Sequence, residues 1–192
     1  NTAVGTVTVS QDIAGAIDGT VGNDIIIGDS ASSQLNGVGG NDILLGGGGN
    51  SRLWKRIREA EGLSYDVRSQ VQWNNFEPNS VWFASAILAP QNRAKVEAAF
   101  FEEIERALRG GFSAQELLEG QRGLLNFRRL SRAQDGTLAS SLANNLYLGR
   151  SFALAGRVDA ALTALTLPQV NAALRKYIVP RDFVLAVAGD FK

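Results

Sequence analysis

Three residue types are absent from the 192-residue sequence, which contains no cysteine, no histidine and no methionine. Without cysteine the chain has no disulfides, thiolate nucleophiles or cysteine-ligated metal centres. Without histidine it has neither a Ser-His-Asp triad nor a histidine-ligated zinc ion. Any metal site in this chain must therefore be built from oxygen ligands, which favour hard cations such as calcium.

Basic and aromatic residues are missing from the first 50 residues. That segment holds five Asp and no Glu, whereas all 19 Lys and Arg and every aromatic residue lie after residue 50. The net charge of zero therefore combines an acidic segment with a basic one. Such a shift in composition predicts a boundary near residue 50, between an acidic glycine-rich segment (1–50) and a second domain (51–192).

Long hydrophobic runs are missing as well. No apolar stretch approaches the roughly 20 residues of a membrane-spanning helix, so we expect no membrane span. The start of the chain lacks the basic and then apolar pattern of a signal peptide. Because the chain begins with Asn1, we expect it to be an internal fragment or a processed piece.

The glycine-rich segment contains a nine-residue repeat. Residues 19–54 divide into four nonapeptides, GTVGNDIII, GDSASSQLN, GVGGNDILL and GGGGNSRLW. The first and third match the G-G-x-G-x-D-x-U-x pattern at most positions, with an aliphatic residue in the U position. This segment resembles the hemolysin-type calcium-binding (RTX) repeat. The alternative from the residues alone is a flexible linker rich in turns.

The resemblance to RTX repeats implies a short parallel beta roll, in which residues 18 positions apart stack in neighbouring coils. It brings Gly22 and Asp24 next to Gly40 and Asp42, and these four residues form the expected calcium site. On the opposite edge, serines stand where the pattern has aspartates, so we expect one good site at most. The same resemblance implies an extracellular or periplasmic location.

After residue 50 the pattern is that of an α/β (α+β) domain. Alternating valines also predict a strand over 2–10, and the apolar run 183–188 is typical of a strand at the centre of a sheet. The expected helices cover 51–61, 91–109, 113–149 in segments, 151–165 and 166–177. The expected strands cover 64–76, 81–89 and 183–188, the first two paired as a hairpin.

Residues 45–65 carry a specific series of motifs. A run of glycines is followed by SRL at 51–53, by REAEGLSY at 58–65 and then by a predicted strand, and the chain closes on an apolar strand and Gly189-Asp190. In this order of elements, residues 45–192 resemble the C-terminal domain of the pitrilysin/insulinase metallopeptidases. The resemblance implies a two-layer domain with an antiparallel or mixed sheet and packed helices.

In that family the domain without zinc contributes an Arg and a Tyr, seven residues apart, that hydrogen-bond the substrate backbone near the scissile carbonyl. The matching residues here are Arg58 and Tyr65. A guanidinium and a phenol can both donate to a carbonyl oxygen that gains charge in the transition state. The alternative is a solvated helix arginine and a half-buried strand tyrosine without a role in binding.

The zinc centre of that family is missing, because its H-x-x-E-H motif needs histidines that this sequence lacks. We therefore expect no zinc in this chain and no peptidase activity from it alone. The resemblance implies a non-catalytic domain or subunit that helps to hold peptide substrate for a zinc-bearing pitrilysin-like partner. The alternative is a secreted, calcium-dependent structural or adhesion module with a relic peptidase domain.

Two further expectations concern the fold and the surface. In the family a strand and a helix precede the glycine run, and here the RTX-like repeats stand in their place, so we expect the sheet to lack that strand and its covering helix. A basic cluster at Arg122, Arg128, Arg129 and Arg132 alternates with apolar residues. This pattern indicates a helix with a solvated basic face and no nucleic-acid site.

Overall fold

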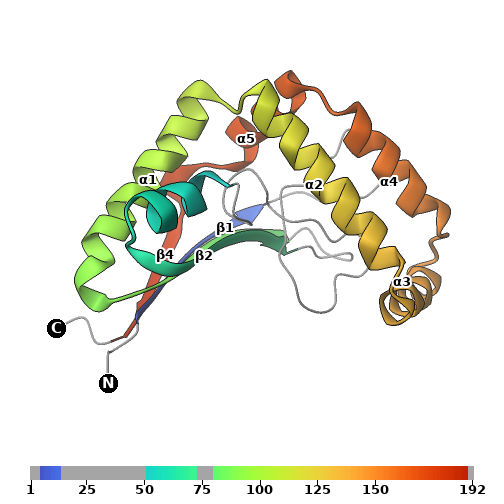
Figure 1. Cartoon of the computed structure of the whole chain (residues 1–192), viewed down its shortest axis with the longest axis horizontal. Coiled ribbons are helices and arrows are strands. Elements are labelled where there is room, and N and C mark those ends of the chain that lie inside the picture. Colours follow the sequence, from blue (N-terminus) through green and yellow to red (C-terminus); the bar gives the residue numbers. More distant parts are fainter. Residues whose placement is uncertain (1–4, 14–50, 73–79, 190–192) are drawn as a thin grey trace.

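The computed structural model describes residues 5–13, 51–72 and 80–189 of the chain (Figure 1). Four strands and eight helical segments follow one another in this part. They are β1 (Gly5–Ile13), η1 (Trp54–Ala60), β2 (Ser64–Gln72), β3 (Ser80–Leu88), η2 (Pro90–Asn92), α1 (Arg93–Gly110), α2 (Ala114–Arg132), α3 (Asp135–Tyr147), α4 (Ala153–Ala164), α5 (Leu167–Tyr177), η3 (Pro180–Asp182) and β4 (Val184–Ala188). The predicted α+β class is confirmed, whereas the predicted beta roll lies outside the described residues.

The four strands form one sheet in the order β2-β3-β1-β4, and all neighbours are antiparallel. β2 and β3 form the expected hairpin, with Val67 opposite Ala86. β1 lies between β3 and β4, so that Val7 is opposite both Ala86 and Val187. The expectation that the sheet lacks a strand before the glycine run is therefore wrong, because residues 5–13 supply a central strand. The division of the chain at residue 50 stays a prediction, but the sheet contains strands from both sides of it.

The position of β4 also differs from the expectation. The apolar run 183–188 was expected at the centre of the sheet, but β4 is an edge strand that pairs with β1. The side chain of Val184 is 65% exposed. Phe183 and Val187 pack against the core. An edge strand with one packed face is as apolar in sequence as a central strand, so the pattern alone does not distinguish them.

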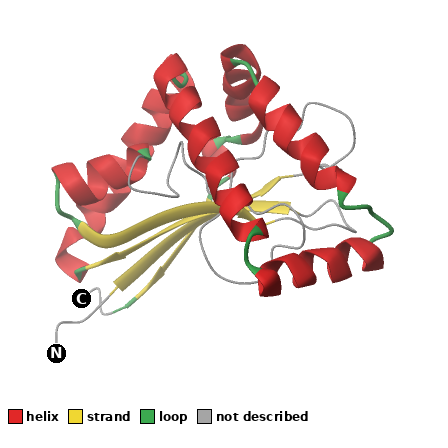
Figure 2. Ribbon diagram, turned by 45° about the vertical axis from the view of Figure 1, so that its right-hand side comes forward, coloured by secondary structure: helices red, strands yellow, loops and turns green. Residues whose placement is uncertain are grey.

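α1, α5 and η1 pack against one face of the sheet, and Figure 2 shows helices above that face while the other face of the sheet carries none of the described helices. Apolar side chains of β2, β3, η1, α1 and α5 meet in one core cluster, in which Trp82 of β3 is fully buried and stacks against Phe100 and Phe183. We call these elements together with β1 and β4 the sheet layer. The helix α1 has its buried stripe at Val96, Ala99, Phe100, Glu103, Ile104 and Ala107.

The helices α2, α3 and α4 extend away from the sheet as an arch (Figure 1). We call residues 114–164, which contain these three helices, the helical arm. α2 begins at a capping box, in which the Ser113 side chain accepts from the Glu116 amide and the Glu116 side chain accepts from the Ser113 amide. The arm buries few apolar side chains, namely Leu124, Leu154 and Leu162.

Gly111 joins α1 to the helical arm and needs to be glycine. Its φ of 70° lies in the left-handed region, and a Cβ there would lie 2.7 Å from the side-chain amide of Asn171. That amide accepts a hydrogen bond from the Phe112 amide at 2.7 Å and donates one to the Phe112 carbonyl at 3.2 Å. The helix predicted over 91–109 is confirmed, with its end at Gly110, and Asn171 of α5 fixes the direction in which the chain leaves it.

Candidate functional site

Arg58 lies on η1, which is a π-helix and not an ordinary α-helix. The amide of Glu61 donates to the carbonyl of Arg56, five residues earlier, as a π-helix requires. Gly62, with a φ of 61°, ends the helix and turns the chain into β2. Because Leu53 and Ile57 are buried, η1 is fixed to the core while Arg58 stays at the surface side of the same helix.

Tyr65 lies in a β-bulge at the start of β2. The register passes from Ser64 opposite Leu88 to Asp66 opposite Ile87, which leaves Tyr65 as the extra residue. The Ser64 hydroxyl lies 2.8 Å from the Asp66 carbonyl and 2.7 Å from the Ile87 carbonyl, so it braces the bulge. The Tyr65 side chain is 78% exposed, so it is more exposed than the half-buried strand tyrosine of the alternative interpretation.

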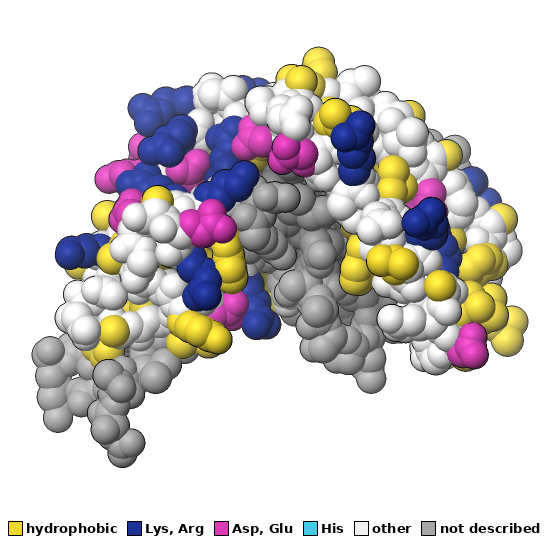
Figure 3. Space-filling view, viewed as in Figure 1, with side chains coloured by type: hydrophobic (Ala, Val, Ile, Leu, Met, Phe, Trp, Pro, Cys, Tyr) yellow, Lys and Arg dark blue, Asp and Glu magenta, His cyan; other side chains and the backbone are white. Residues whose placement is uncertain are grey.

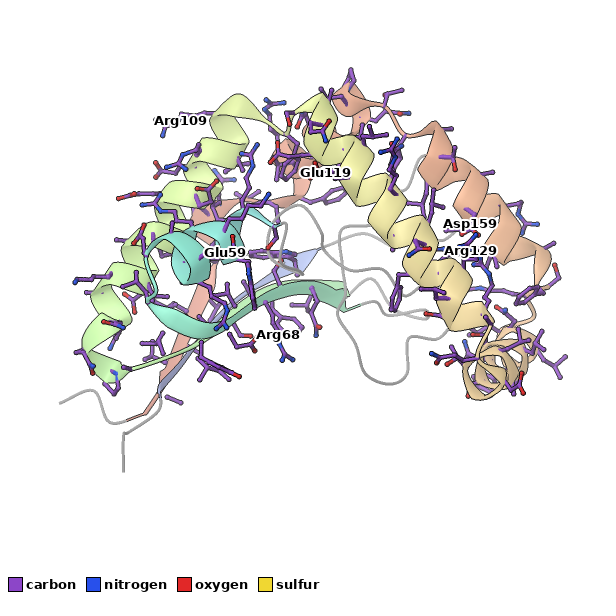
Figure 4. All side chains as sticks on the ribbon, in the orientation of Figure 1. Glu59, Arg68, Arg109, Glu119, Arg129 and Asp159 are labelled. Atoms are coloured by element: carbon purple, nitrogen blue, oxygen red, sulfur yellow. The ribbon has the colours of Figure 1, made fainter. Side chains whose placement is uncertain are left out.

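The structure brings Arg58 and Tyr65 together. The helix η1, which carries Arg58, lies against the strand β2, which carries Tyr65. Figure 4 labels one other residue of each element, Glu59 on η1 and Arg68 on β2. An Nη1 hydrogen of Arg58 is donated to the backbone carbonyl of Tyr65. The Arg58 Cζ atom lies 4.9 Å from the centre of the Tyr65 ring and 4.8 Å from that of Trp54. At exposed sites each such cation–π contact contributes about 0.5–1 kcal/mol.

Arg58 differs from the two other arginines of this stretch in how its charge is balanced. Arg52 binds Glu116, with its Nε 2.6 Å from one carboxylate oxygen and an Nη2 2.8 Å from the other. Arg56 binds Glu61 at 2.9 Å and Glu102 at 2.5 Å. Among the residues that the structure describes, no carboxylate forms an ion pair with Arg58; its contacts are two rings and one carbonyl oxygen. No other described residue accepts a hydrogen bond from Arg58.

The Arg52–Glu116 pair ties the start of η1 to the start of α2. Burial raises the pKa of Glu116, but the hydrogen bonds from Arg52 and from Ser113 outweigh it and hold that pKa at about 2. Arg52 also donates to the Gly111 carbonyl at 2.8 Å and lies over the Phe112 ring. The segment that carries Arg58 is thus fixed to the junction between the sheet layer and the helical arm.

The basic cluster on α2 is not a wholly solvated face. The Arg128 side chain is 5% exposed, and its Nε lies 2.5 Å from Asp159 on α4. Arg132 binds the other oxygen of Asp159, also at 2.5 Å; Arg129 and Asp159 are labelled on these two helices in Figure 4. For Arg128 the expectation of a solvated position is wrong, because a carboxylate on a neighbouring helix compensates its burial, which the local sequence does not show.

The predicted calcium residues, Gly22, Asp24, Gly40 and Asp42, lie outside the described residues. In the described ranges, no group of three or more His, Cys, Asp or Glu residues is placed to hold a metal ion. No helix in those ranges is both long and apolar enough to cross a membrane. Of the site residues predicted from the sequence, Arg58 and Tyr65 lie in the part of the chain that the structure describes.

Sequence reasoning missed Trp54 as a member of this site. No role is predicted for it from the sequence, whereas the structure places its indole against the Arg58 guanidinium. The four-residue spacing between Trp54 and Arg58 could have indicated such a contact, because residues three or four apart are neighbours on a helix surface.

Residues 42–124 of this chain match the family model described as peptidase M16 inactive domain. The matched range includes Arg58 and Tyr65 and also residues 42–54, the last part of the nine-residue repeat. The inactive character of that family agrees with the expectation that this chain has no peptidase activity by itself. No curated protein matches the sequence.

Solved structures share the fold of this chain. A peptidase M16 inactive domain from Pseudomonas fluorescens has a TM-score of 0.72 and 19% identity, over 97% of this chain and 41% of the other. The inactive peptidase domain of a candidate zinc protease from Bordetella parapertussis has a TM-score of 0.70 and 14% identity, over 98% of this chain and 93% of the other. The periplasmic protease PqqL from Escherichia coli has a TM-score of 0.65 and 17% identity, over 96% of this chain and 19% of the other. The chain thus spans about two fifths of the Pseudomonas structure and nearly all of the Bordetella domain.

Proposed function

We propose that this chain is a non-catalytic domain of an M16 (pitrilysin-type) metallopeptidase, and that Arg58 and Tyr65 hold peptide substrate for a zinc-bearing partner domain or subunit. The fold shared with M16 inactive domains and the family match over residues 42–124 support the family part of this proposal. The absence of histidine from the sequence means that zinc of the H-x-x-E-H type must come from the partner.

The observation that carries the proposal is that no carboxylate among the described residues forms an ion pair with Arg58. Arg52 and Arg56 bind carboxylates, whereas the Arg58 guanidinium lies over two aromatic rings, one of them that of the exposed Tyr65. A cation that is held in place but not neutralised is suited to a carbonyl oxygen that becomes negative during reaction. The irregular elements on either side support this view, because π-helices and β-bulges are frequent at functional sites.

In this proposal the residues of this chain bind and orient the peptide. The Arg58 guanidinium and the Tyr65 hydroxyl donate hydrogen bonds to backbone carbonyls of the substrate, so binding does not depend strongly on the substrate side chains. A zinc ion held by the partner would supply a polarised water as the nucleophile. Arg58 then stabilises the oxygen that gains negative charge, and it does so more strongly in the transition state than in the bound substrate.

The size of the chain and the relatives bear on the partner and the location. The chain spans about two fifths of the Pseudomonas structure, and that leaves room for a second domain in a longer assembly.

PqqL is a periplasmic protease, and we propose a periplasmic or extracellular location for this chain as well. The substrate in this proposal is an unfolded peptide, because the two side-chain donors, Arg58 and Tyr65, bind main-chain carbonyls, and these must be exposed in the substrate.

The test combines this chain with an H-x-x-E-H-bearing M16 chain encoded beside it and follows cleavage of internally quenched peptides of mixed sequence. We expect activity from the mixture and none from this chain alone. Arg58→Ala should lower kcat/KM about 100-fold, as does loss of one oxyanion donor in other enzymes. Tyr65→Phe should lower kcat/KM about 10-fold, as expected for one neutral hydrogen bond.

Two matched variants control for general effects of these substitutions. Tyr147 is 79% exposed, almost the same as Tyr65, but lies on the helical arm. Arg129 is an exposed arginine on α2. Tyr147→Phe and Arg129→Ala should leave kcat/KM unchanged. If Arg58→Ala retains full activity in a mixture that cleaves peptide, this chain does not hold substrate through Arg58.

A second function is favoured by one specific observation, the two GND tripeptides at 22–24 and 40–42, which lie 18 residues apart in a nine-residue frame. We propose as the alternative that residues 19–54 bind calcium through Gly22, Asp24, Gly40 and Asp42 in a secreted structural or adhesion module. The family match over residues 42–54 competes with this interpretation, because it accounts for the last part of the repeat in another way.

Calcium binding is tested by thermal melting of the chain with and without millimolar calcium, beside an Asp24→Asn/Asp42→Asn double variant. A ligand that binds only the folded state raises the melting midpoint. A rise that the double variant abolishes would support the calcium module. An unchanged midpoint with a cooperative transition would remove calcium from the function of this chain.

A further inference from the structure

We infer that Trp54 is a positioning residue for Arg58: its indole fixes the guanidinium in the orientation in which Arg58 meets the substrate backbone. This inference rests on the proposed function and adds to it a residue that neither the motif nor the family description assigns. Trp54 does not touch substrate in this inference. It acts through Arg58, by limiting the orientations that the arginine side chain samples.

The geometry of the three side chains carries the inference. Trp54 and Arg58 are four residues apart on the π-helix η1, and the Arg58 Cζ atom lies 4.8 Å from the indole centre. Tyr65, from the bulge of β2, presents its ring 4.9 Å from the same atom. Because one ring comes from the helix and the other from the strand, the two contacts restrict the guanidinium from two different elements.

A comparison with Arg52 and Arg56 shows why aromatic rings, and not carboxylates, are suited to orient Arg58. Those two arginines are fixed by carboxylates, which also neutralise them. A carboxylate beside Arg58 would compete with the substrate oxygen for the same N–H groups. Aromatic rings hold a guanidinium by its face and leave the N–H groups at its edge open to an acceptor. Trp54 therefore orders Arg58 without reducing its ability to donate.

Trp54 also packs against the core, so a purely structural role is the alternative to be separated. Trp54→Phe keeps an aromatic face in this place, whereas Trp54→Leu keeps an apolar side chain without a π system. A structural role depends on apolar packing, and because Phe and Leu are both smaller than Trp, it predicts losses of stability and activity that do not depend on the presence of Arg58. A positioning role depends on the ring, and only Phe should preserve it.

The first measurement needs no partner. In the ¹⁵N-labelled full chain, the Arg58 Nε–H signal is assigned through its loss in Arg58→Lys, and its chemical shift reports the nearby rings. We expect Trp54→Leu to move it toward the shift of a solvated arginine and Trp54→Phe to keep most of its displacement. Tyr177→Leu is the matched control, because Tyr177 also packs against the core and its ring lies 4.7 Å from another cation, Lys176, and it should leave the signal in place. A signal that Trp54→Leu does not move would overturn the inference.

The second measurement uses the mixture with the zinc-bearing chain. Trp54→Leu should lower kcat/KM about fivefold, which is about 1 kcal/mol at 1.4 kcal/mol per tenfold, and Trp54→Phe should restore most of it. In an Arg58→Ala background, Trp54→Leu should have no further effect, because its contribution passes through Arg58. An equal loss in both backgrounds would show that Trp54 acts independently of Arg58 and would overturn the inference.

Failure of the proposed function gives a different result from failure of this inference. If Arg58→Ala does not change peptide cleavage, the substrate role of Arg58 is wrong, and the NMR shift alone decides whether Trp54 orders the arginine. If Arg58→Ala abolishes cleavage while Trp54→Leu changes neither the shift nor kcat/KM, the proposed function stands and the positioning role is wrong. Melting midpoints of the Leu and Phe variants confirm that both are folded.

Discussion

The sheet layer and the helical arm differ in the interactions that stabilise each of them internally. In the sheet layer, apolar side chains from two strands and three helices form one continuous cluster around Trp82, Phe100 and Ile104. The arm buries few apolar residues but contains buried Arg128 and Asn145. The surfaces of the two regions differ as well. Figure 3 shows apolar side chains exposed at the α3 and α4 end, whereas side chains of both charges are mixed over α1 and η1.

In the helical arm, polar contacts join α2 to α4 where the sheet layer has apolar packing. Asp159 on α4 binds Arg128 and Arg132 on α2. Gln121 on α2 donates to the carbonyls of Leu162 and Leu165 at the end of α4. Among the described residues, the sheet layer, which carries Arg58 and Tyr65, is therefore the part with the larger apolar core, and a site that must orient a reacting carbonyl benefits from such support.

The largest expected effect comes from a cavity in the sheet layer. Ile104 is fully buried in α1, and Ile104→Ala should lower the free energy of unfolding by about 3–4 kcal/mol, because a cavity remains where the side chain was. Leu146 of the arm is 82% exposed, and Leu146→Ser should stay within about 0.5 kcal/mol of the parent. Urea unfolding measures both. Similar losses in the two variants would contradict the contrast between the regions.

A smaller and more local effect is expected from the arm. Asp159→Asn keeps the shape of the side chain but leaves the buried Arg128 charge uncompensated. Because Asp159 is itself partly exposed, we expect a loss of about 2 kcal/mol, below that of a fully buried pair. Hydrogen exchange should accelerate at α4 amides and stay unchanged in β3.

The control for that variant is Asp182→Asn, which breaks an exposed pair with Arg181. Exposed pairs contribute little, so exchange should be the same as in the parent throughout the chain. If Asp159→Asn accelerates exchange equally in α4 and β3, the arm and the sheet layer unfold as one unit and do not differ in stability.

The smallest expected effect concerns the junction between the two regions and depends on pH. The folded pKa of Glu116 is about 2, below its ordinary 4.5, so its contribution is present above about pH 4.5 and is lost as the pH falls toward 2. Because the carboxylate is partly exposed, we expect a contribution of about 1–2 kcal/mol. Glu116→Gln should be less stable than the parent by this amount at pH 7, and the difference should disappear near pH 2. Urea unfolding at several pH values measures it, and a pH-independent difference would contradict the assignment.

Much of the order of elements was predictable from local patterns. The capping box at Ser113 and Glu116, the helix end at Gly111 and the hairpin of β2 and β3 all follow from residues that are close in sequence. Caps and turns are determined by contacts within a few residues, and these are visible in the sequence itself. The spacing of Arg58 and Tyr65 was visible in the same way, through the motif that contains them.

The parts that were not predictable depend on contacts between distant segments. β1 lies at residues 5–13 but pairs with β3, more than 60 residues later, and with β4 at the end of the chain. Nothing in the alternating valines of β1 indicates its neighbours, because many pairings would bury the same side chains. The burial of Arg128 has the same origin, since Asp159, which compensates it, lies on another helix.

The sequence by itself determined which chemistry is present: no histidine for zinc, an Arg and a Tyr seven residues apart, and the order of helices and strands. The tertiary structure alone decided how these residues are used. The π-helix and the bulge bring Arg58 between Trp54 and Tyr65, and no carboxylate of the described residues pairs with it. The physical reason is that residue types set which interactions a side chain can form, whereas burial and partners, which set whether its charge stays available, come from packing between elements that are distant in the chain.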